Sequence, residues 1–144
     1  MIISIKPDNF RHNTTTLTKT IDLSSCETDE KLFKAFAIGL DFPDWFGYNW
    51  DAFHDCMLNL CFDVDNTLAV DLLNCDNCFR SNQVNLKWLL QDINAMASGK
   101  ATQDDGRQID VVFNLYFNEK QTMEYSKNQI EKQLCENLCL SVTN

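Results

Sequence analysis

The chain has 144 residues, a length that suits one compact domain better than two. Its hydrophobic content of 44% can supply a real core, but no run of eighteen apolar residues is present that would span a membrane. The formal net charge of −9 would repel the phosphates of DNA or RNA, which argues against direct nucleic-acid binding. The first residues lack the charged leader, apolar stretch and cleavage site of a signal peptide, so we expect a soluble, cytoplasmic protein.

Strand and helix patterns alternate along the chain, with few glycines or prolines to mark a linker. In chain order we expect a strand over 2–5, a polar loop over 8–18, a strand over 20–23, a helix over 28–40, a break at Pro43, a helix from Asn49 to about Leu60, a strand over 68–73, a helix over 84–96, a loop over 99–106, a strand over 109–117 and a helix over 119–138. The strand over 109–117 has so few polar residues that it is expected to be covered by helices on both faces, as in a parallel sheet.

This order of elements predicts a single α/β domain over residues 1–144. We expect two or three layers, in which a small, mainly parallel, three-stranded sheet is flanked by helices. An additional strand near the N-terminus and an additional helix near the C-terminus complete the expected architecture.

The negative charge is concentrated in one third of the chain. No Lys or Arg occurs between Lys34 and Arg80, and the rest of the chain is nearly neutral, with thirteen acids against twelve bases. The acidic residues of this segment are Asp41, Asp44, Asp51, Asp55, Asp63, Asp65, Asp71 and Asp76. Such a segment would attract a basic protein partner or would simply keep the protein soluble, and composition alone does not decide between the two.

The helix that begins after Asn49 separates an apolar stripe from an acidic face. Trp50, Phe53, Met57 and Leu60 recur at intervals of three or four and are expected to face the core. Asp51, Asp55 and Leu58 then face solvent. Two like charges four residues apart cost a few tenths of a kcal/mol, roughly, in an isolated helix, and no Lys or Arg lies nearby in the sequence to offset them. We therefore interpret these carboxylates as retained for a cationic partner.

The segment before this helix is rich in aromatic residues. Pro43 and Gly47 predict a tight loop, in which Trp45 and Tyr48 are expected to be exposed and Phe46 to pack into the core. Aromatic rings beside exposed acids are typical of a protein-binding patch, because the rings anchor while the carboxylates orient the partner.

These residues also carry a resemblance to a known family. The run Phe-Pro-Asp-Trp-Phe-Gly over 42–47, followed by Asn-Trp-Asp-Ala over 49–52 and Asp-Cys over 55–56, resembles the signature of the barstar family, intracellular inhibitors of barnase-type ribonucleases. The order of elements extends the resemblance over about 19–117, which leaves 1–18 and 118–144 as extensions.

The resemblance implies an inhibitor and not an enzyme. In the family, the second helix and the loop before it plug the nuclease active site, and an acidic side chain takes the place of the RNA phosphate. Asp55 matches the phosphate mimic and Asp51 its supporting acid, while Asn49, Gly47 and Trp45 match positions that touch the enzyme. The implied partner is a basic ribonuclease or ribonuclease toxin, bound 1:1 by a monomeric immunity protein or antitoxin of bacterial type. Tyr48 and Leu58 complete the expected binding patch.

Two positions qualify what the resemblance implies. His54 stands where the best-known member of the family has tryptophan, which suggests a target other than barnase itself. Asp92 lies near an acidic contact position, but the match there could slip by one helical turn. A barstar-fold module for a basic partner without nuclease activity remains the alternative.

Enzymatic and metal-binding alternatives have weaker support. Asp51 and Asp55 resemble a hydrolytic carboxylate pair only in their spacing. Phe62-Asp-Val-Asp-Asn-Thr-Leu68 resembles the first motif of haloacid-dehalogenase-type phosphatases, but that chemistry needs its aspartates at the end of a buried strand, and 56–61 is predicted to end a helix. Seven cysteines suit a reducing compartment. Cys75 and Cys78 have the gap of a zinc half-site, with Cys135 and Cys139 as conceivable partners, yet we favour free buried thiols and expect no metal or cofactor.

Overall fold

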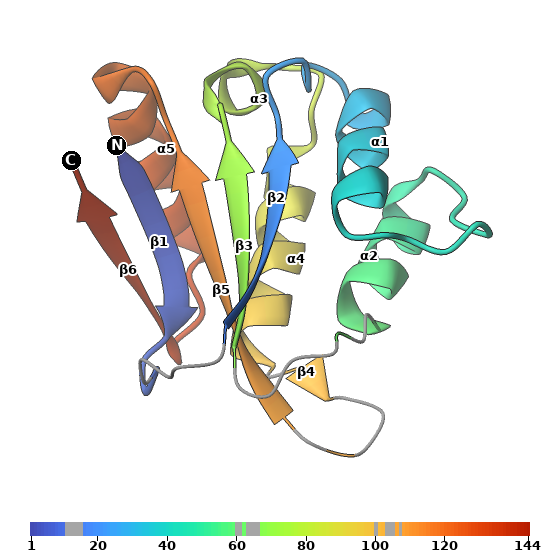
Figure 1. Ribbon diagram of the computed structural model, residues 1–144. Coiled ribbons are helices and arrows are strands. Elements are labelled where there is room, and N and C mark those ends of the chain that lie inside the picture. Colours follow the sequence, from blue (N-terminus) through green and yellow to red (C-terminus); the bar gives the residue numbers. More distant parts are fainter. Residues whose placement is uncertain (11–15, 60–61, 63–66, 100, 103–105, 107) are drawn as a thin grey trace.

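The computed structural model describes residues 1–10, 16–59, 62, 67–99, 101–102, 106 and 108–144 (Figure 1). The elements in chain order are β1 (Ile2–Pro7), β2 (Thr16–Asp22), α1 (Asp29–Gly39), α2 (Trp50–Asn59), β3 (Thr67–Leu73), α3 (Asp76–Arg80), α4 (Leu86–Ser98), β4 (Ala101–Thr102), β5 (Gln108–Tyr116), α5 (Lys120–Gln133) and β6 (Leu138–Thr143). The alternation of strands and helices confirms the predicted α/β class.

The strands form a mixed sheet in the order β2-β3-β5-β1-β6, with the short β4 paired to β5. β2, β3 and β5 run parallel, whereas β1 is antiparallel to both β5 and β6. The register places an apolar row across all five strands, formed by Ile21, Leu72, Leu115, Ile3 and Val142. This row contributes to a core that joins the two ends of the chain to its middle.

The sheet is wider than the three strands predicted. The three parallel strands and the additional N-terminal strand exist as predicted, but β1 joins the same sheet beside β5 and β6, which was not predicted, extends it further on that side. β6 was missed because the helical pattern was continued to Leu138, whereas α5 ends at Gln133 and Leu134 already has extended backbone (ψ 131°). β2 starts at Thr16, inside the segment predicted to be a polar loop, because β-branched threonines suit a strand even where Thr18 and Thr20 are exposed.

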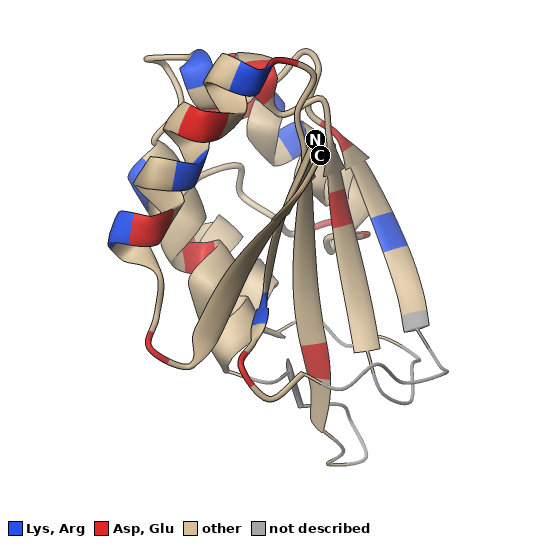
Figure 2. Cartoon of the chain, turned by 90° about the vertical axis from the view of Figure 1, so that its left-hand side faces the viewer, with Lys and Arg blue, Asp and Glu red and all other residues tan. Residues whose placement is uncertain are grey.

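The helices gather on one side of the sheet (Figure 2), and α1, α4 and α5 contact its strands. Along β1, buried and half-buried residues alternate, because successive side chains point to opposite faces. The face away from the helices carries a polar row in which Ser4 donates to Asn114 (Oγ–Oδ1 2.7 Å) and Asn114 donates to Asp71 (Nδ2–Oδ1 2.9 Å). The expectation that β5 is covered by helices on both faces is therefore wrong for the described chain.

Asp76, another residue of the acidic segment, serves the fold rather than the surface. It is 6% exposed, and its carboxylate accepts hydrogen bonds from the backbone N–H of Asn118 (2.9 Å) and of Glu119 (3.1 Å). These bonds tie α3 to the residues that begin α5. Asp71 and Asp76 thus bind partners inside the protein, and the aspartate-rich segment does not form a single acidic face.

Four of the six cysteines that the structure describes are buried, and we expect their thiols to be unreactive in the native protein. Burial raises the pKa of Cys26 to about 11 and that of Cys78 to about 12, and it also raises the pKa values of Cys56 and Cys75. Because the thiolate is the nucleophile, these four should be modified by a thiol reagent at pH 8 only after unfolding. Peptide mapping with and without denaturant measures this, and the half-buried Cys135 and Cys139 serve as the reactive comparison.

The raised pKa values of these thiols also determine how the free energy of unfolding changes with pH. Each raised pKa means that the folded protein holds the thiol proton more tightly than the unfolded chain does. The resulting contribution to stability is complete below the ordinary pKa of 9.0 and is lost as the pH rises toward about 11 or 12. Urea unfolding should therefore give a lower free energy at pH 10.5 than at pH 8. Rapid labelling of Cys78 in the native state would contradict this account.

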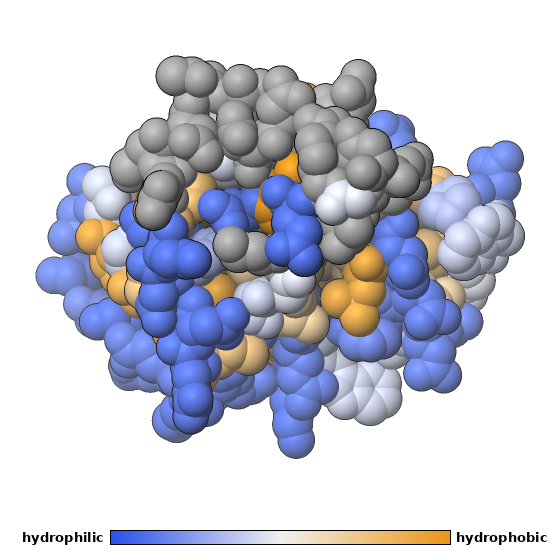
Figure 3. Space-filling model, turned by 90° about the horizontal axis from the view of Figure 1, so that it is seen from below, coloured by the Kyte–Doolittle hydropathy of each residue, from blue (hydrophilic) through white to orange (hydrophobic). Residues whose placement is uncertain are grey.

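Within the described residues, no helix is long and apolar enough to span a bilayer. Seen from the end of the molecule where β4 lies, the described surface is mainly hydrophilic, and hydrophobic residues appear there as small separate spots (Figure 3). The exposed aromatic side chains of the described residues are Trp45 and Tyr48 in the loop before α2, Trp88 on α4 and Tyr125 on α5.

Candidate protein-binding site

Helix α2 begins with a side-chain cap formed by Asn49. The Oδ1 atom of Asn49 accepts from the backbone N–H of Ala52 (2.9 Å), and its Nδ2 donates to the carbonyl of Gly47 (3.2 Å). A Cβ added to Gly47 would lie 3.1 Å from that same Nδ2, so a larger residue would push against the cap. Asn49 and Gly47 therefore fix where the helix starts and how the loop enters it.

The loop before α2 holds one ring inside and two outside. Phe46 is 5% exposed, whereas Trp45 and Tyr48 are 70% and 52% exposed, as predicted. Tyr48 has a φ of 53°, in the left-handed region that non-glycine residues rarely adopt, and its ring lies 4.7 Å from that of Phe46. A bulky residue held in this strained conformation presents its ring next to the first turn of α2.

The exposed side of α2 carries the two predicted carboxylates. Asp51, His54, Asp55 and Leu58 are exposed, while Phe53, Cys56 and Met57 on the other side are buried. Among the described residues, neither Asp51 nor Asp55 forms an ion pair, whereas the acids of α5 pair with its lysines, as in Lys127–Glu131 (3.5 Å). Figure 2 shows both signs of charge along α5. The carboxylates of α2 therefore remain available to a cation from outside.

A partly buried network that the sequence did not reveal holds α2 in place. The two carboxylate oxygens of Asp29, in the first turn of α1, accept from the indole N–H of Trp50 (3.0 Å) and from the backbone N–H of Asn85 (2.8 Å). Asp29 thus joins the starts of α1, α2 and α4. These partners lie 21 and 56 residues away in the sequence, so their contacts with Asp29 depend on the tertiary fold.

We expect Asp29→Ala to lower the free energy of unfolding by about 2 kcal/mol, because two donors lose a charged acceptor. Glu30→Ala is the matched control, since Glu30 lies in the same turn but only pairs with Lys34 at the surface (3.1 Å). That exposed pair is worth about 0.3 to 0.5 kcal/mol. Chemical denaturation of both variants measures the difference. Equal losses would show that Asp29 does not join the three helices.

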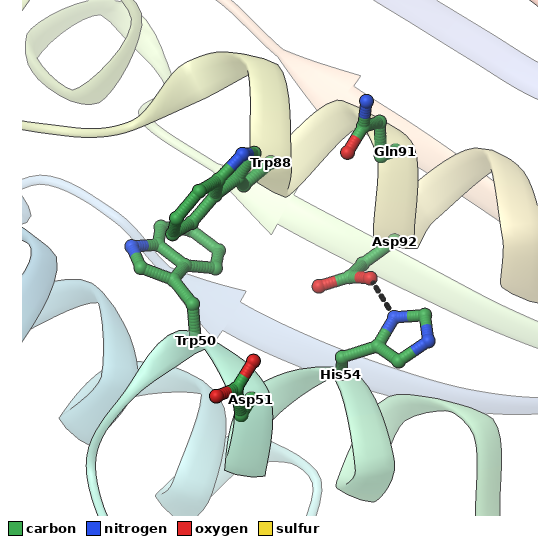
Figure 4. A pocket seen from close by; sticks show the side chains of 6 residues that line it. All are labelled: Trp50, Asp51, His54, Trp88, Gln91 and Asp92. Atoms are coloured by element: carbon green, nitrogen blue, oxygen red, sulfur yellow. Dashed lines mark hydrogen bonds and ion pairs between the residues drawn. The ribbon is translucent and has the colours of Figure 1, made fainter.

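A slot of about 170 Å³ lies between α2 and α4 beside the acidic face (Figure 4). Its lining residues are Trp50, Asp51, His54, Trp88, Gln91 and Asp92. The rings of Trp50 and Trp88 meet edge to face, with centroids 5.8 Å apart. Trp88 is 46% exposed at the rim. Because it lies outside the apolar stripe of α4, its exposure could have been predicted from the sequence.

The slot brings His54 and Asp92 together from different helices. His54 Nδ1 lies 2.5 Å from Asp92 Oδ1, and the His54 side chain is 52% exposed while that of Asp92 is 6% exposed. Burial raises the pKa of Asp92, and the hydrogen bond and charge of His54 oppose this shift. Asp92 therefore lies beside α2, but its carboxylate lies beneath His54 rather than on the surface.

The described residues do not assemble a metal site. No group of three metal-ligating side chains converges among them, and Cys75, Cys78, Cys135 and Cys139 are all free. Asp63 and Asp65 of the phosphatase-like motif lie outside the described residues. These two aspartates fall between Asn59, the last residue of α2, and Thr67, the first residue of β3. They therefore precede a strand, whereas the phosphatase chemistry needs aspartates that follow one.

Comparison with known proteins gives likenesses of fold and a family match. A solved structure of the ORC2 protein of Aeropyrum pernix, in ADPNP and ADP complexes, is similar over 84% of this chain and 31% of that one. The TM-score is 0.54 at 15% sequence identity, so the likeness concerns the fold alone. This chain corresponds to less than a third of that protein's chain. No curated protein matches the sequence.

A family model described as "Barstar (barnase inhibitor)" matches residues 16–114. The matched part runs from the start of β2 into β5, and it includes α1, the aromatic loop, α2 and α4. β6 and β1, which widen the sheet, lie outside it. Because the match covers well over half of the chain, the protein belongs to the barstar family.

Proposed function

We propose that the protein is an intracellular inhibitor that binds a ribonuclease and blocks its active site with α2 and the loop before it. The observation that carries the proposal is the exposed pair Asp51 and Asp55, which has no cationic partner among the described residues and lies on the helix that the family match includes. A ribonuclease active site must attract RNA phosphates, and a carboxylate is the side chain that can replace a phosphate there.

The arrangement suits a partner that is basic and concave. Trp45 and Tyr48 offer apolar anchors at one end of the face, and Asp51 and Asp55 lie on the following helix. Asn49 and Gly47 hold these two parts in a fixed relation through the helix cap. Pre-organised aromatic anchors beside charged groups lower the cost of ordering on binding. The complex is proposed to be 1:1, with the inhibitor acting as a monomer and an immunity protein or antitoxin as its role.

The test is capture of partners on the immobilised protein from cells that contain it, followed by an RNA-cleavage assay of what is captured. We expect a small basic protein whose ribonuclease activity disappears when one equivalent of the inhibitor is added. Capture by the wild-type protein but not by Asp55→Ala ties the result to the proposed face. A basic partner without ribonuclease activity would instead support a binding module and contradict inhibition.

Association should depend strongly on salt. Long-range attraction between the acidic face and a basic partner speeds encounter, and dissolved ions screen it over about 8 Å at 0.15 M ionic strength. We expect the association rate constant to fall by about tenfold or more between 25 and 500 mM NaCl, while the dissociation rate constant changes less. Stopped-flow fluorescence measures both rate constants. An association rate that does not respond to salt would exclude the carboxylates of α2 as the steering groups.

A further inference from the structure

His54 lies between a buried carboxylate and solvent. On its inner side, Nδ1 faces Oδ1 of Asp92 at 2.5 Å, and Asp92 is only 4% exposed. Figure 4 shows the second ring nitrogen, Nε2, on the side of the ring away from Asp92. No hydrogen bond to Nε2 occurs within the described residues, and the side chain is 52% exposed. One nitrogen is therefore occupied and the other is free to meet a partner.

The buried carboxylate determines which nitrogen carries the proton. An ionised carboxylate can only accept hydrogen bonds, so the ring must donate through Nδ1–H. In a neutral imidazole the other nitrogen is then a bare acceptor. The hydrogen bond from His54 opposes the rise that burial causes in the pKa of Asp92, which gives the contact a reason to persist in the free protein.

We propose that Asp92 is a positioning residue which holds His54 as the Nδ1–H tautomer, so that Nε2 is presented on the α2 face as a hydrogen-bond acceptor. The group that it accepts from is an N–H donor of the basic partner. The tautomer is a property of the free protein, whereas the role in docking rests on the proposed function. The charged side chains around the ring are Asp51 and Asp92, which line the same slot, and Asp55, which follows His54 in α2. All three are acids, so their negative charge attracts a cationic N–H donor of a partner.

This assignment separates the roles of the two acids that line the slot. Asp51 is exposed and can reach a partner directly. Asp92 is covered by the imidazole and acts through it. Replacing Asp92 should therefore change the binding face by releasing His54 and not by removing a direct contact.

Two substitutions of His54 test whether its Nε2 accepts a hydrogen bond from the partner. His54→Phe keeps a ring but removes the acceptor, and His54→Gln provides an amide oxygen at a similar reach. With the ribonuclease that the inhibition assay identifies, we expect His54→Phe to raise Kd about tenfold, the value of one hydrogen bond, and His54→Gln to raise it less. Equal affinities for His54→Phe and the wild-type protein would overturn the acceptor role.

The closing experiment uses the free protein, so that its outcome does not depend on any partner. Two-bond ¹H–¹⁵N NMR spectra of the ¹⁵N-labelled chain, recorded at a pH at which the ring is neutral, distinguish the two tautomers of His54. We expect Nδ1–H with a bare Nε2 in the wild-type protein and in Asp92→Asn, whose amide oxygen can still accept. Asp92→Leu should move the ring toward the Nε2–H form that unconstrained histidine prefers.

A wild-type spectrum with the proton on Nε2 would overturn the proposal, and so would an Asp92→Leu spectrum identical to that of the wild-type protein. The wild-type spectrum decides the matter even if Asp92→Leu does not fold. Failure to inhibit any ribonuclease would leave these spectra unchanged, so the two proposals are judged separately.

Discussion

Asp55→Ala should weaken the complex with the target ribonuclease by about 2 kcal/mol or more, roughly 30-fold in Kd, while the protein stays folded. Asp55 is exposed and forms no ion pair within the described residues, so its removal leaves no buried partner unsatisfied in the free protein. In the complex, the cationic groups of the nuclease would lose the carboxylate that replaces the RNA phosphate. Titration calorimetry gives the affinity, and thermal unfolding of the free protein gives the stability.

Two comparisons make this result specific. Glu124→Ala removes an exposed acid from α5 and should leave Kd unchanged, because α5 lies away from α2. The free energy of unfolding of Asp55→Ala should rise by a few tenths of a kcal/mol, roughly, since Asp51 loses a like charge one turn away. If Asp55→Ala unfolds the protein, or if it binds as tightly as the wild-type protein, the phosphate-mimic role is wrong.

Phe53→Ala should lower the free energy of unfolding by about 3 to 5 kcal/mol, the usual range for a large buried aromatic residue. Phe53 is fully buried, and its ring lies 5.1 Å from that of Phe36 and 5.6 Å from that of Phe33, both in α1. These contacts hold α2 against α1. The variant should also inhibit the ribonuclease poorly at temperatures at which α2 no longer packs against α1, even though Phe53 itself contacts no partner.

Leu58→Ala is the control for this loss, because Leu58 lies on the same helix but is 44% exposed. We expect it to change the free energy of unfolding by less than about 1 kcal/mol. Urea unfolding followed by tryptophan fluorescence measures both variants. A loss below 1 kcal/mol for Phe53→Ala would show that the aromatic cluster does not hold α2 in place.

The sequence predicted best those features that depend on neighbours along the chain. Helical spacing separated Asp51, Asp55 and Leu58 from the buried Phe53 and Met57, and the structure confirms that separation. The exposure of Trp45 and Tyr48 and the burial of Phe46 were also predicted correctly. Caps and amphipathic stripes are set within a few residues, so a single sequence contains enough information to reveal them.

Features that join distant segments could not be predicted in this way. The contact of His54 with Asp92 spans 38 residues, and that of Asp29 with Asn85 spans 56. The aspartate-rich segment suggested one acidic face, but Asp71 and Asp76 bind partners inside the protein. β6 pairs with β1 from the other end of the chain, and no local pattern required that pairing. Each of these features arises when the packing of the whole domain places two segments together.

The most direct test of the central claim is the kinetic pattern of inhibition by the wild-type protein. A protein that occupies the RNA-binding site must compete with RNA, so the apparent inhibition constant should rise linearly with RNA concentration, with kcat unchanged. Initial rates of the captured ribonuclease, measured over a range of RNA and inhibitor concentrations, give this pattern. Competitive inhibition is the result expected if the acidic face of α2 fills the active site. Inhibition that lowers kcat and does not depend on RNA concentration would contradict the account.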